Sequence, residues 1–328
     1  MNTRSVILRV EEQSQQRLKV VWMVVTDGRL GNFGPYSVPL QQLRADTAKV
    51  RQHLNDLVAE YNNRTYRYGP VLERLADAGA ALHFTLFDGA VSDRIQATRA
   101  RDWLAKQVPG SVQITVSTDG TVHVPWGLIF ADDVPTKQSP LRTDYEGFWA
   151  FRYNVATQHV AMQPSRFQQG LADAAFKVVS LLDRQVFGGV KPTLPASEQT
   201  LLDALLNRPI GPAFDTDEGI AYLKQAATSD CLLNVFSHAS GQDIHLSSGS
   251  LSVGDLRRHF LHPRQTTPGY QAEALLFLNG CNTAVGDLDN SFLNATAEPG
   301  CAGFIGSEAK LPDEFALRAA VVVLHGLL

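Results

Sequence analysis

Two short apolar runs in the second half of the chain each precede a side chain that can do chemistry. Residues 232–236 are followed by Ser237 and then His238, and residues 275–278 are followed closely by Cys281. A continuous apolar run of this length is typical of a strand that is buried on both faces. In open α/β proteins, functional groups collect just beyond the carboxyl ends of parallel strands. The pattern therefore predicts that an imidazole and a thiol lie at the same edge of one sheet.

The N-terminal part of the chain has a different pattern. Residues 6–10 and 18–25 have strand patterns, and a polar stretch separates them, which predicts a β-hairpin. Apolar positions recur at helical spacing over residues 40–61, which predicts an amphipathic helix. We expect residues 1–68 to form a small regulatory or docking segment ahead of a main domain over residues 69–328.

Helices and short strands alternate along the main domain. Helical patterns cover residues 70–86, 94–108, 198–206 and 217–227, and strand patterns cover residues 111–116, 121–124 and 176–182. This alternation favours an α/β fold in which a mostly parallel sheet is flanked by helices on both faces. The small β-hairpin and helix would precede that sheet.

The segment between His238 and Cys281 indicates how the chain returns to the sheet. Residues 241–252 have the pattern of a short hairpin, and a helix is expected to begin at Ser252 and to end near Phe260. Two parallel strands need a crossover of this kind between them. His238 and Cys281 are therefore predicted to be neighbours, as a cysteine nucleophile and its base would be.

Composition and charge exclude several classes of function. The 328 residues are 44% hydrophobic and 19% charged, which is enough for one large core or two modest ones. The formal net charge is −4 and no basic stretch occurs, so neither a nucleic-acid partner nor an anionic membrane is expected. No apolar run approaches the ~18 residues of a membrane-spanning helix, so a membrane role is not expected.

Cysteine content and the two ends of the chain lead to two further expectations. Only three cysteines occur, and residues 1–5 lead into a charged segment without the apolar core of a signal peptide, so a reducing cytoplasm is expected. Residues 321–328 have an apolar helical pattern with no polar tail. We therefore expect the chain to be one module of a longer protein.

Several motifs together resemble those of a known family. They are residues 124–129, 236–238, 251–256, 278–283 and 303–307. In this order and spacing, over about residues 70–328, they resemble a CHAT domain, which belongs to the caspase-like cysteine peptidases alongside caspases and separase.

The resemblance implies a caspase-like fold and a Cys-His dyad that needs neither cofactor nor metal. Cys281 would attack the carbonyl carbon of a peptide bond as a thiolate and form an acyl-enzyme. His238 would assist thiolate formation or protonate the leaving amine. The backbone N–H groups of Ala239 and Cys281 would hold the oxyanion. The substrate would be a protein, and a sensor or activating partner would release the enzyme from a latent state.

Departures from the family pattern leave the cleavage preference open. The family usually has glycine directly after the catalytic histidine, where this chain has Ala239. It commonly has Glu-Thr-Gly after the cysteine, where residues 282–284 are Asn-Thr-Ala. The Trp and Val that border the specificity pocket in the family are absent from residues 308–312.

Three acidic residues are candidates for the substrate pocket. Asp313 stands where the family often carries an acid, and acids near the pocket in relatives select a basic residue before the scissile bond. The alternative is that Asp313 simply opens the helix that runs to Leu324, directly after Pro312. Asp287 and Asp289 are pocket acids or turn residues, and the sequence leaves both interpretations open.

The remaining cysteines and histidines give no metal prediction. Cys231 and Cys301 have no His, Cys or acid at metal-ligand spacing, and we expect buried, inert thiols. His245, His259 and His262 lack a second cluster of ligands, so we expect them to be solvated.

Three functional hypotheses follow. The leading one is a latent cysteine endopeptidase, and bacterial members of the family commonly serve in stress responses or antiphage defence. The second is a catalytically inactive caspase-like scaffold that binds a peptide or protein partner. Ala239 and the altered pocket segment favour the scaffold, whereas retention of both His238 and Cys281 favours the peptidase. A nucleotide-binding α/β domain is disfavoured, because no glycine-rich phosphate loop follows a strand.

Overall fold

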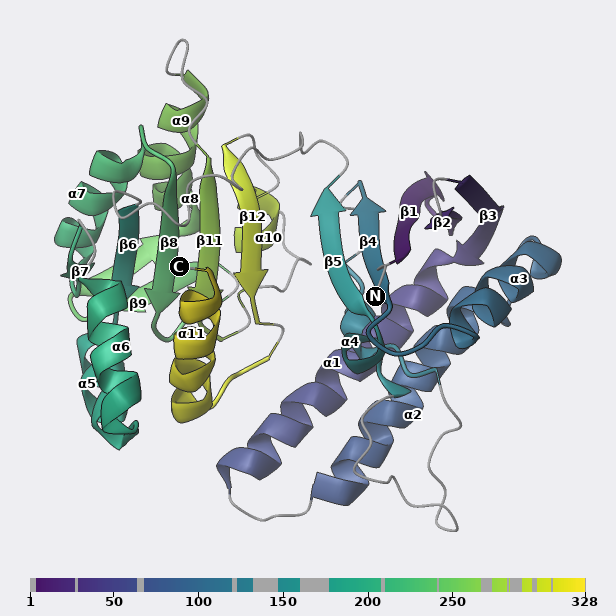
Figure 1. Ribbon diagram of the computed structural model, residues 1–328, viewed down its shortest axis with the longest axis horizontal. Coiled ribbons are helices and arrows are strands. Elements are labelled where there is room, and N and C mark those ends of the chain that lie inside the picture. The colour runs from purple at the N-terminus through teal and green to yellow at the C-terminus, as the bar shows by residue number, and fades with distance from the viewer. Residues whose placement is uncertain are drawn as a thin grey trace. The chain divides into compact units, whose positions relative to one another are not determined.

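The chain forms two compact units, Met1–Val160 and Ala161–Leu328 (Figure 1). The computed structural model describes residues 4–26, 29–63, 68–119, 123–131, 147–159, 177–207, 210–240, 242–266, 273–281, 283, 291–296, 300–307 and 309–327. None of the described helices combines the length and the apolar character that crossing a bilayer requires.

The first unit contains a five-stranded mixed sheet. Its strands are β1 (Arg4–Ser14), β2 (Arg17–Thr26), β3 (Arg29–Pro39), β4 (Val112–Thr118) and β5 (Asn154–His159), in the order β3-β2-β1-β4-β5. The first three strands pair antiparallel, and β4 pairs parallel with β1 and with β5. Buried and exposed residues alternate along the first half of β1, with Val6, Leu8 and Val10 buried, as expected for a strand with one face on a core.

One core joins this sheet to its helices. The helices are α1 (Leu40–Asn62), α2 (Tyr68–Phe87), α3 (Arg94–Ala105), η1 (Trp126–Leu128) and α4 (Trp149–Arg152). The Trp22 ring lies 5.6 Å from the Phe87 ring and 6.1 Å from the Trp149 ring. The Trp22 indole N–H donates to the Tyr36 hydroxyl at 2.9 Å, and burial raises the pKa of Tyr36.

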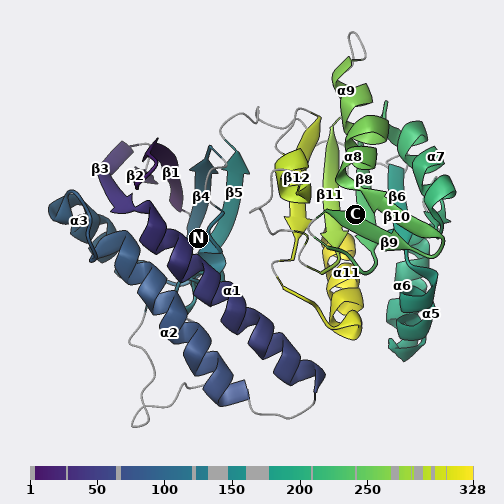
Figure 2. The ribbon, with the colours of Figure 1, turned by 180° about the vertical axis from the view of Figure 1, so that it is seen from behind.

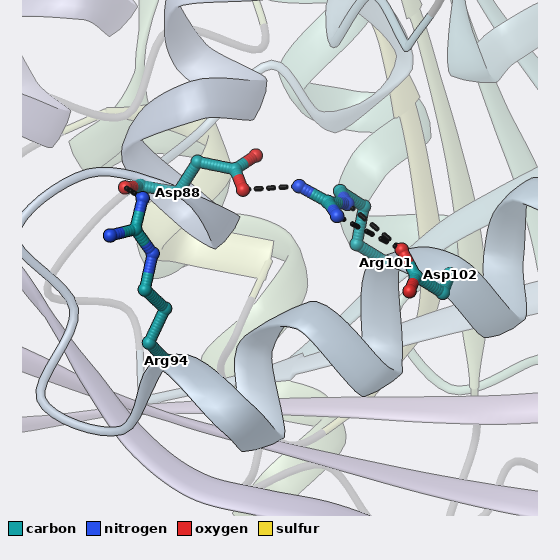
Figure 3. Close-up of polar contacts among 4 residues, drawn as sticks. All are labelled: Asp88, Arg94, Arg101 and Asp102. Carbon is teal, nitrogen blue, oxygen red and sulfur yellow. Dashed lines mark hydrogen bonds and ion pairs between the residues drawn. The ribbon is translucent and has the colours of Figure 1, made fainter.

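An ion-pair cluster fixes the turn between α2 and α3. Arg101 pairs with Asp88 and with Asp102, and Arg94 Nη2 donates to the Asp88 carbonyl oxygen at 3.5 Å (Figure 3). The hydrogen bond with Asp88 is the main reason that the pKa of Arg101 is raised. Because these side chains are partly exposed, each pair contributes about 0–1 kcal/mol, and the cluster mainly orients the turn.

The boundary between the units differs from the expected one. The predicted hairpin and helix are confirmed as β1, β2 and α1, but β1 pairs with β4 from Arg4–Val112 to Val10–Thr118. Residues 1–68 therefore belong to a larger sheet, and the first compact unit extends to Val160. A pairing between strands so distant in sequence leaves no local pattern from which it could be predicted.

Two strand assignments in this unit also differ from the prediction. β3 is missing from the sequence prediction, because several glycines and prolines interrupt its apolar pattern. A strand was expected over residues 121–124, but residues 121 and 122 lie outside the described part, and His123 and Val124 are not in a strand.

The second unit is built on a five-stranded parallel sheet. Its strands are β6 (Lys177–Leu182), β7 (Pro212–Ala213), β8 (Cys231–Phe236), β11 (Ala274–Asn279) and β12 (Cys301–Gly306), in the order β12-β11-β8-β6-β7. The other elements are α5 (Arg184–Val190), η4 (Lys191–Thr193), α6 (Ala196–Leu206), α7 (Thr216–Ala226), the hairpin β9 (Asp243–Leu246) and β10 (Gly249–Ser252), α8 (Val253–Leu256), η5 (Arg257–Leu261), α9 (His262–Thr266), α10 (Phe292–Thr296) and α11 (Asp313–Leu327).

Helices cover both faces of this sheet, as predicted. Leu233 and Val235 of β8 face a core formed with α7, α8 and η5, whereas Leu232 and Phe236 face a core formed with α5, α6 and α11. The two layers are seen from opposite sides in Figures 1 and 2. β8 is apolar except for the buried Asn234 because neither of its faces meets solvent, and each fully buried leucine contributes about 1.5–3 kcal/mol. The α/β fold class is therefore confirmed.

The helix after the hairpin begins where predicted but ends later. The Ser252 hydroxyl and the Asp255 carboxylate form a reciprocal capping box at its start. The prediction ended the helix near Phe260, whereas the structure continues past Pro263, which cannot donate a backbone hydrogen bond. A π-helical turn, Arg257–Leu261, precedes that proline, and helix continues to Thr266.

Candidate active site

The register of β8 and β11 brings the two predicted catalytic residues to one level of the sheet. These parallel neighbours align Val235 with Leu278 and Phe236 with Asn279. His238 and Cys281 each follow two positions after the last aligned residue. Because neighbouring strands lie ~4.8 Å apart, the two segments leave the same edge of the sheet side by side.

The residue before Cys281 touches the residues on either side of His238. A Cβ built on Gly280 would lie 2.8 Å from the Ala239 Cβ and 2.9 Å from the Ser237 carbonyl oxygen. Real Cβ atoms do not approach this closely, so only glycine fits at position 280 without a shift of its neighbours. The chain segments that carry the imidazole and the thiol are therefore in direct contact.

The hairpin β9–β10 holds the backbone of His238. Its carbonyl oxygen accepts hydrogen bonds from the His245 N–H at 2.9 Å and from the Ser237 hydroxyl at 2.8 Å. The Ser240 N–H donates to the Asp243 carbonyl oxygen at 2.8 Å. The His238 side chain itself is exposed, so its imidazole can exchange protons with solvent.

The same two backbone bonds determine where the Ala239 N–H points. The bonds from the His245 N–H and from the Ser240 N–H lie on either side of the antiparallel pair Ala239–Ile244. Ala239 and Ile244 therefore form a non-hydrogen-bonded pair, in which neither residue donates its N–H to the other. The Ala239 N–H therefore points away from β9. Within the described part of the chain it has no hydrogen-bond acceptor.

Cys281 is a half-buried free thiol next to the start of α11. The side-chain amide of Asn279 donates to the Ala316 carbonyl oxygen at 2.6 Å, which ties α11 to the end of β11. Burial is the main cause that raises the pKa of Cys281, and Asp313 raises it further. A backbone hydrogen bond from Leu311 and the charge of Lys310 act in the opposite direction.

Both interpretations of Asp313 fit its place in the fold. Asp313 is the first residue of α11, where a carboxylate interacts favourably with the helix dipole. It is also close enough to Cys281 to affect the pKa of the thiol. Asp287 and Asp289, the other two candidate pocket acids, lie outside the described residues.

Two polar residues for which the sequence predicted no role, Thr283 and Ser307, connect the end of β11 with the residue that follows β12. Thr283 is fully buried, and its hydroxyl donates to the Leu278 carbonyl oxygen at 2.7 Å and accepts from the Ser307 N–H at 3.0 Å. The Ser307 hydroxyl donates to the Gly280 carbonyl oxygen at 2.6 Å. Both residues lie within motifs of the sequence analysis, but their partnership depends on the pairing of β11 with β12, which the sequence does not reveal.

The other cysteines are poor nucleophiles. Cys231 is fully buried, and burial raises its pKa to about 11 although Arg264 Nη2 donates to its sulfur at 2.9 Å. Cys301 retains some exposure, and burial raises its pKa to about 12. Cys231 is buried as predicted, whereas Cys301 is only partly buried, and the inertness of both thiols stays a prediction.

His245, His259 and His262, which follow β8 in the chain, belong to no group of metal ligands among the described residues. His245 and His262 are exposed, as expected, whereas His259 is half-buried. His245 Nδ1 lies 2.8 Å from the Ser250 hydroxyl across the hairpin. No three His, Cys, Asp or Glu side chains within the described ranges gather as metal ligands.

No protein-family model matches the chain, and no curated protein matches it. The functional argument therefore depends on the residues and the geometry of this site.

Proposed function

We propose that the chain is a caspase-like cysteine endopeptidase that acts through Cys281 and His238. The observation that carries this proposal is the register of β8 and β11, with the Gly280 backbone packed against Ser237 and Ala239. A thiol and an imidazole at the carboxyl ends of adjacent parallel strands can serve as nucleophile and proton carrier.

In the proposed reaction, the Cys281 thiolate sulfur bonds to the carbonyl carbon, and the carbonyl electron pair moves to the oxygen. The N–H groups of Ala239 and Cys281 stabilise that oxyanion. The carbon–nitrogen bond then breaks as His238 gives a proton to the leaving amine. Water, deprotonated by His238, attacks the thioester, and the acid product leaves while the thiol is restored. The N–H of Ala239, which has no acceptor among the described residues, and the exposed imidazole support these two roles.

Asp313 is the proposed determinant of the cleavage preference. Its carboxylate lies near Cys281, so a basic side chain before the scissile bond would find an opposite charge close to the reacting carbonyl. Lys310 acts on the same thiol with the opposite sign and would reduce this preference. We expect Asp313→Asn to weaken cleavage after Arg and Lys more than cleavage after uncharged residues.

The second candidate function is a catalytically inactive scaffold that binds a peptide or protein partner. One observation favours it: burial raises the pKa of Cys281, whereas an activated nucleophilic cysteine has a lowered pKa. Ala239 in place of the family's glycine points the same way.

The cellular role belongs to the same proposal. A protein substrate, an activating partner and a role in bacterial defence or stress signalling follow from the resemblance to CHAT domains, whereas the proposed cytoplasmic location is based on the small number of cysteines. The three cysteines are free, which agrees with a reducing compartment. The net charge of −4 gives no reason to propose a nucleic-acid partner.

Cleavage of a proteome-derived peptide library, read by mass spectrometry, tests the peptidase. Wild type is compared with Cys281→Ala and His238→Ala, and with Cys301→Ala and His245→Ala as matched controls. We expect cleavage by wild type and both controls, and none by the two dyad variants. Cleavage that survives in Cys281→Ala would refute the proposed nucleophile.

If wild type is inactive, an electrophilic peptide probe separates a latent enzyme from a scaffold. A latent site reacts with the probe at Cys281 when a lysate supplies the activating partner. A scaffold binds peptide without labelling at Cys281 under either condition.

A further inference from the structure

The segment after β12 is attached to the turn that carries Cys281. The Ser307 hydroxyl lies between two carbonyl oxygens, 2.6 Å from that of Gly280 and 2.9 Å from that of Ala309. Ala309 is buried, and Leu311 supplies a backbone hydrogen bond to Cys281. The described residues after β12 therefore run past the thiol, held at Ser307 on one side and by the start of α11 on the other.

Thr283 is the buried centre of this attachment. Its single hydroxyl serves both strands, because it donates to the carbonyl oxygen of Leu278 at the end of β11 and accepts from the N–H of Ser307 after β12. A Cβ on Gly306 would lie 2.9 Å from the same oxygen, so the two segments are packed as closely as glycine permits. Hydrogen bonds through Thr283 thus connect the end of β11, just before Cys281, to Ser307 after β12.

We infer that Ser307 and Thr283 are positioning residues that hold a cover, the described residues of 307–313, over Cys281, and that this is the closed, slowly reacting state of the site. That the cover regulates an enzyme rests on the proposed peptidase function. That the cover slows the reaction of the Cys281 thiol does not depend on that function. Activation then requires a partner that breaks the contact between Ser307 and Gly280.

Burial decides the direction of the effect. Cysteine reacts as the thiolate, and burial disfavours that charged form. Burial is the largest contribution to the raised pKa of Cys281, larger than the opposing effects of the Leu311 N–H and Lys310. Asp313 also disfavours the thiolate, and the His238 imidazole on the facing loop is exposed. Displacing the cover exposes the thiol further and removes Asp313, and it also removes the Leu311 N–H and Lys310, which favour the thiolate. Because burial is the largest of these contributions, the thiolate fraction at neutral pH should rise.

Alkylation by iodoacetamide measures this reactivity directly. The thiolate sulfur forms a bond to the reagent carbon, iodide leaves, and the thiol proton goes to solvent. Labelling rates at Cys281 are followed by peptide mass spectrometry for wild type, Ser307→Ala and Ser111→Ala. Ser111 is the matched control, since its hydroxyl also donates to a backbone carbonyl oxygen at 2.6 Å, in the first unit.

We expect Ser307→Ala to label Cys281 about three- to tenfold faster at neutral pH, since one pKa unit changes the thiolate fraction about tenfold. The midpoint of its pH profile should move down, and Ser111→Ala should behave as wild type. An unchanged rate and midpoint in Ser307→Ala would overturn the inference. Equal acceleration in Ser111→Ala would also overturn it.

Cys231 reports whether the variant is folded, because it is fully buried and should remain unlabelled. If Ser307→Ala exposes Cys231, the wild-type chain decides instead. Its Cys281 must react more slowly at neutral pH than the same cysteine in urea-unfolded chain, and an equal or faster rate overturns the inference. Alkylation needs neither His238 nor a substrate. Faster labelling without any cleavage would therefore count against the peptidase and leave the cover standing.

Discussion

Replacing Gly280 with alanine tests the contact that brings the two catalytic segments together. The added methyl group would lie 2.8 Å from the Ala239 Cβ and 2.9 Å from the Ser237 carbonyl oxygen. Real Cβ atoms do not come within 3.0 Å of other heavy atoms, and the carbon–carbon distance falls well below the ~3.5–4.0 Å at which carbon atoms pack favourably. Ser237 follows β8 directly, so the strand cannot easily yield. Overpacking of this kind costs about 1–3 kcal/mol, and the lower entropy of the unfolded alanine chain offsets about 0.4–1 kcal/mol.

The assay must report on the second unit alone. All four tryptophans, at positions 22, 103, 126 and 149, lie in the first unit, so tryptophan fluorescence does not report on the second. Pulse alkylation of the buried Cys231 at increasing urea concentration does. We expect Gly280→Ala to lower the urea midpoint for Cys231 exposure, by a free energy of about 1.3 kcal/mol at the centres of the two ranges and at most about 2.6 kcal/mol.

Two further variants make this prediction specific. Gly188→Ala is the control, because a Cβ at Gly188 in α5 meets nothing within 4 Å. Its midpoint should stay the same or rise slightly, since alanine favours a helix. Adding Ala239→Gly to Gly280→Ala removes the shorter of the two contacts and should restore part of the loss. A wild-type midpoint for Gly280→Ala would refute the reasoning that these loops touch.

Other perturbations test the remaining parts of the structure. Leu276→Ala removes a fully buried side chain of β11 and should lower the stability of the second unit by about 2–5 kcal/mol in the same alkylation assay. Ser252→Ala removes the capping box of α8 and should cost about 0.5–2 kcal/mol by that measurement. Asn279→Ala removes the donor to Ala316 and should speed alkylation of Cys281, because the start of α11 is released. Burial raises the pKa of Tyr36 above 10.0, so the unfolded chain loses this proton first. The stability of the first unit should therefore be complete below about pH 10 and fall above it, which urea unfolding followed by tryptophan fluorescence would detect.

The strands that carry the site could be predicted because they are buried on both faces. β8 is apolar apart from the buried Asn234, and Ser237 and His238 directly after Phe236 mark its end in the sequence. The crossover through the hairpin and α8 then makes β8 and β11 parallel neighbours. His238 and Cys281 each lie two residues beyond the last aligned pair, so they lie at the same level of the sheet. The alternation of helices and strands likewise predicted the fold class of the second unit.

Other features could not be predicted because they depend on contacts between distant segments. The pairing of β1 with β4 makes residues 1–68 part of a larger unit, and no local pattern encodes it. The bonds between Thr283 and Ser307 require that β11 and β12 lie side by side. A single threonine or serine beside a loop has many interpretations in a sequence, and only the three-dimensional arrangement gives these two a common role.

Ala239 stands where CHAT domains, which the sequence motifs resemble, usually have glycine, and the geometry explains how alanine can be accommodated. The oxyanion role requires a free backbone N–H, and the bonds on either side of Ala239 leave its N–H pointing away from the hairpin. The methyl group of Ala239 needs space on the side of the facing loop, and Gly280 provides that space because it has no side chain. There is space for the Ala239 methyl group alone, because a second methyl group on residue 280 would collide with it. Alanine at position 239 therefore fits opposite Gly280, and the backbone N–H that the proposed chemistry uses still points away from the hairpin.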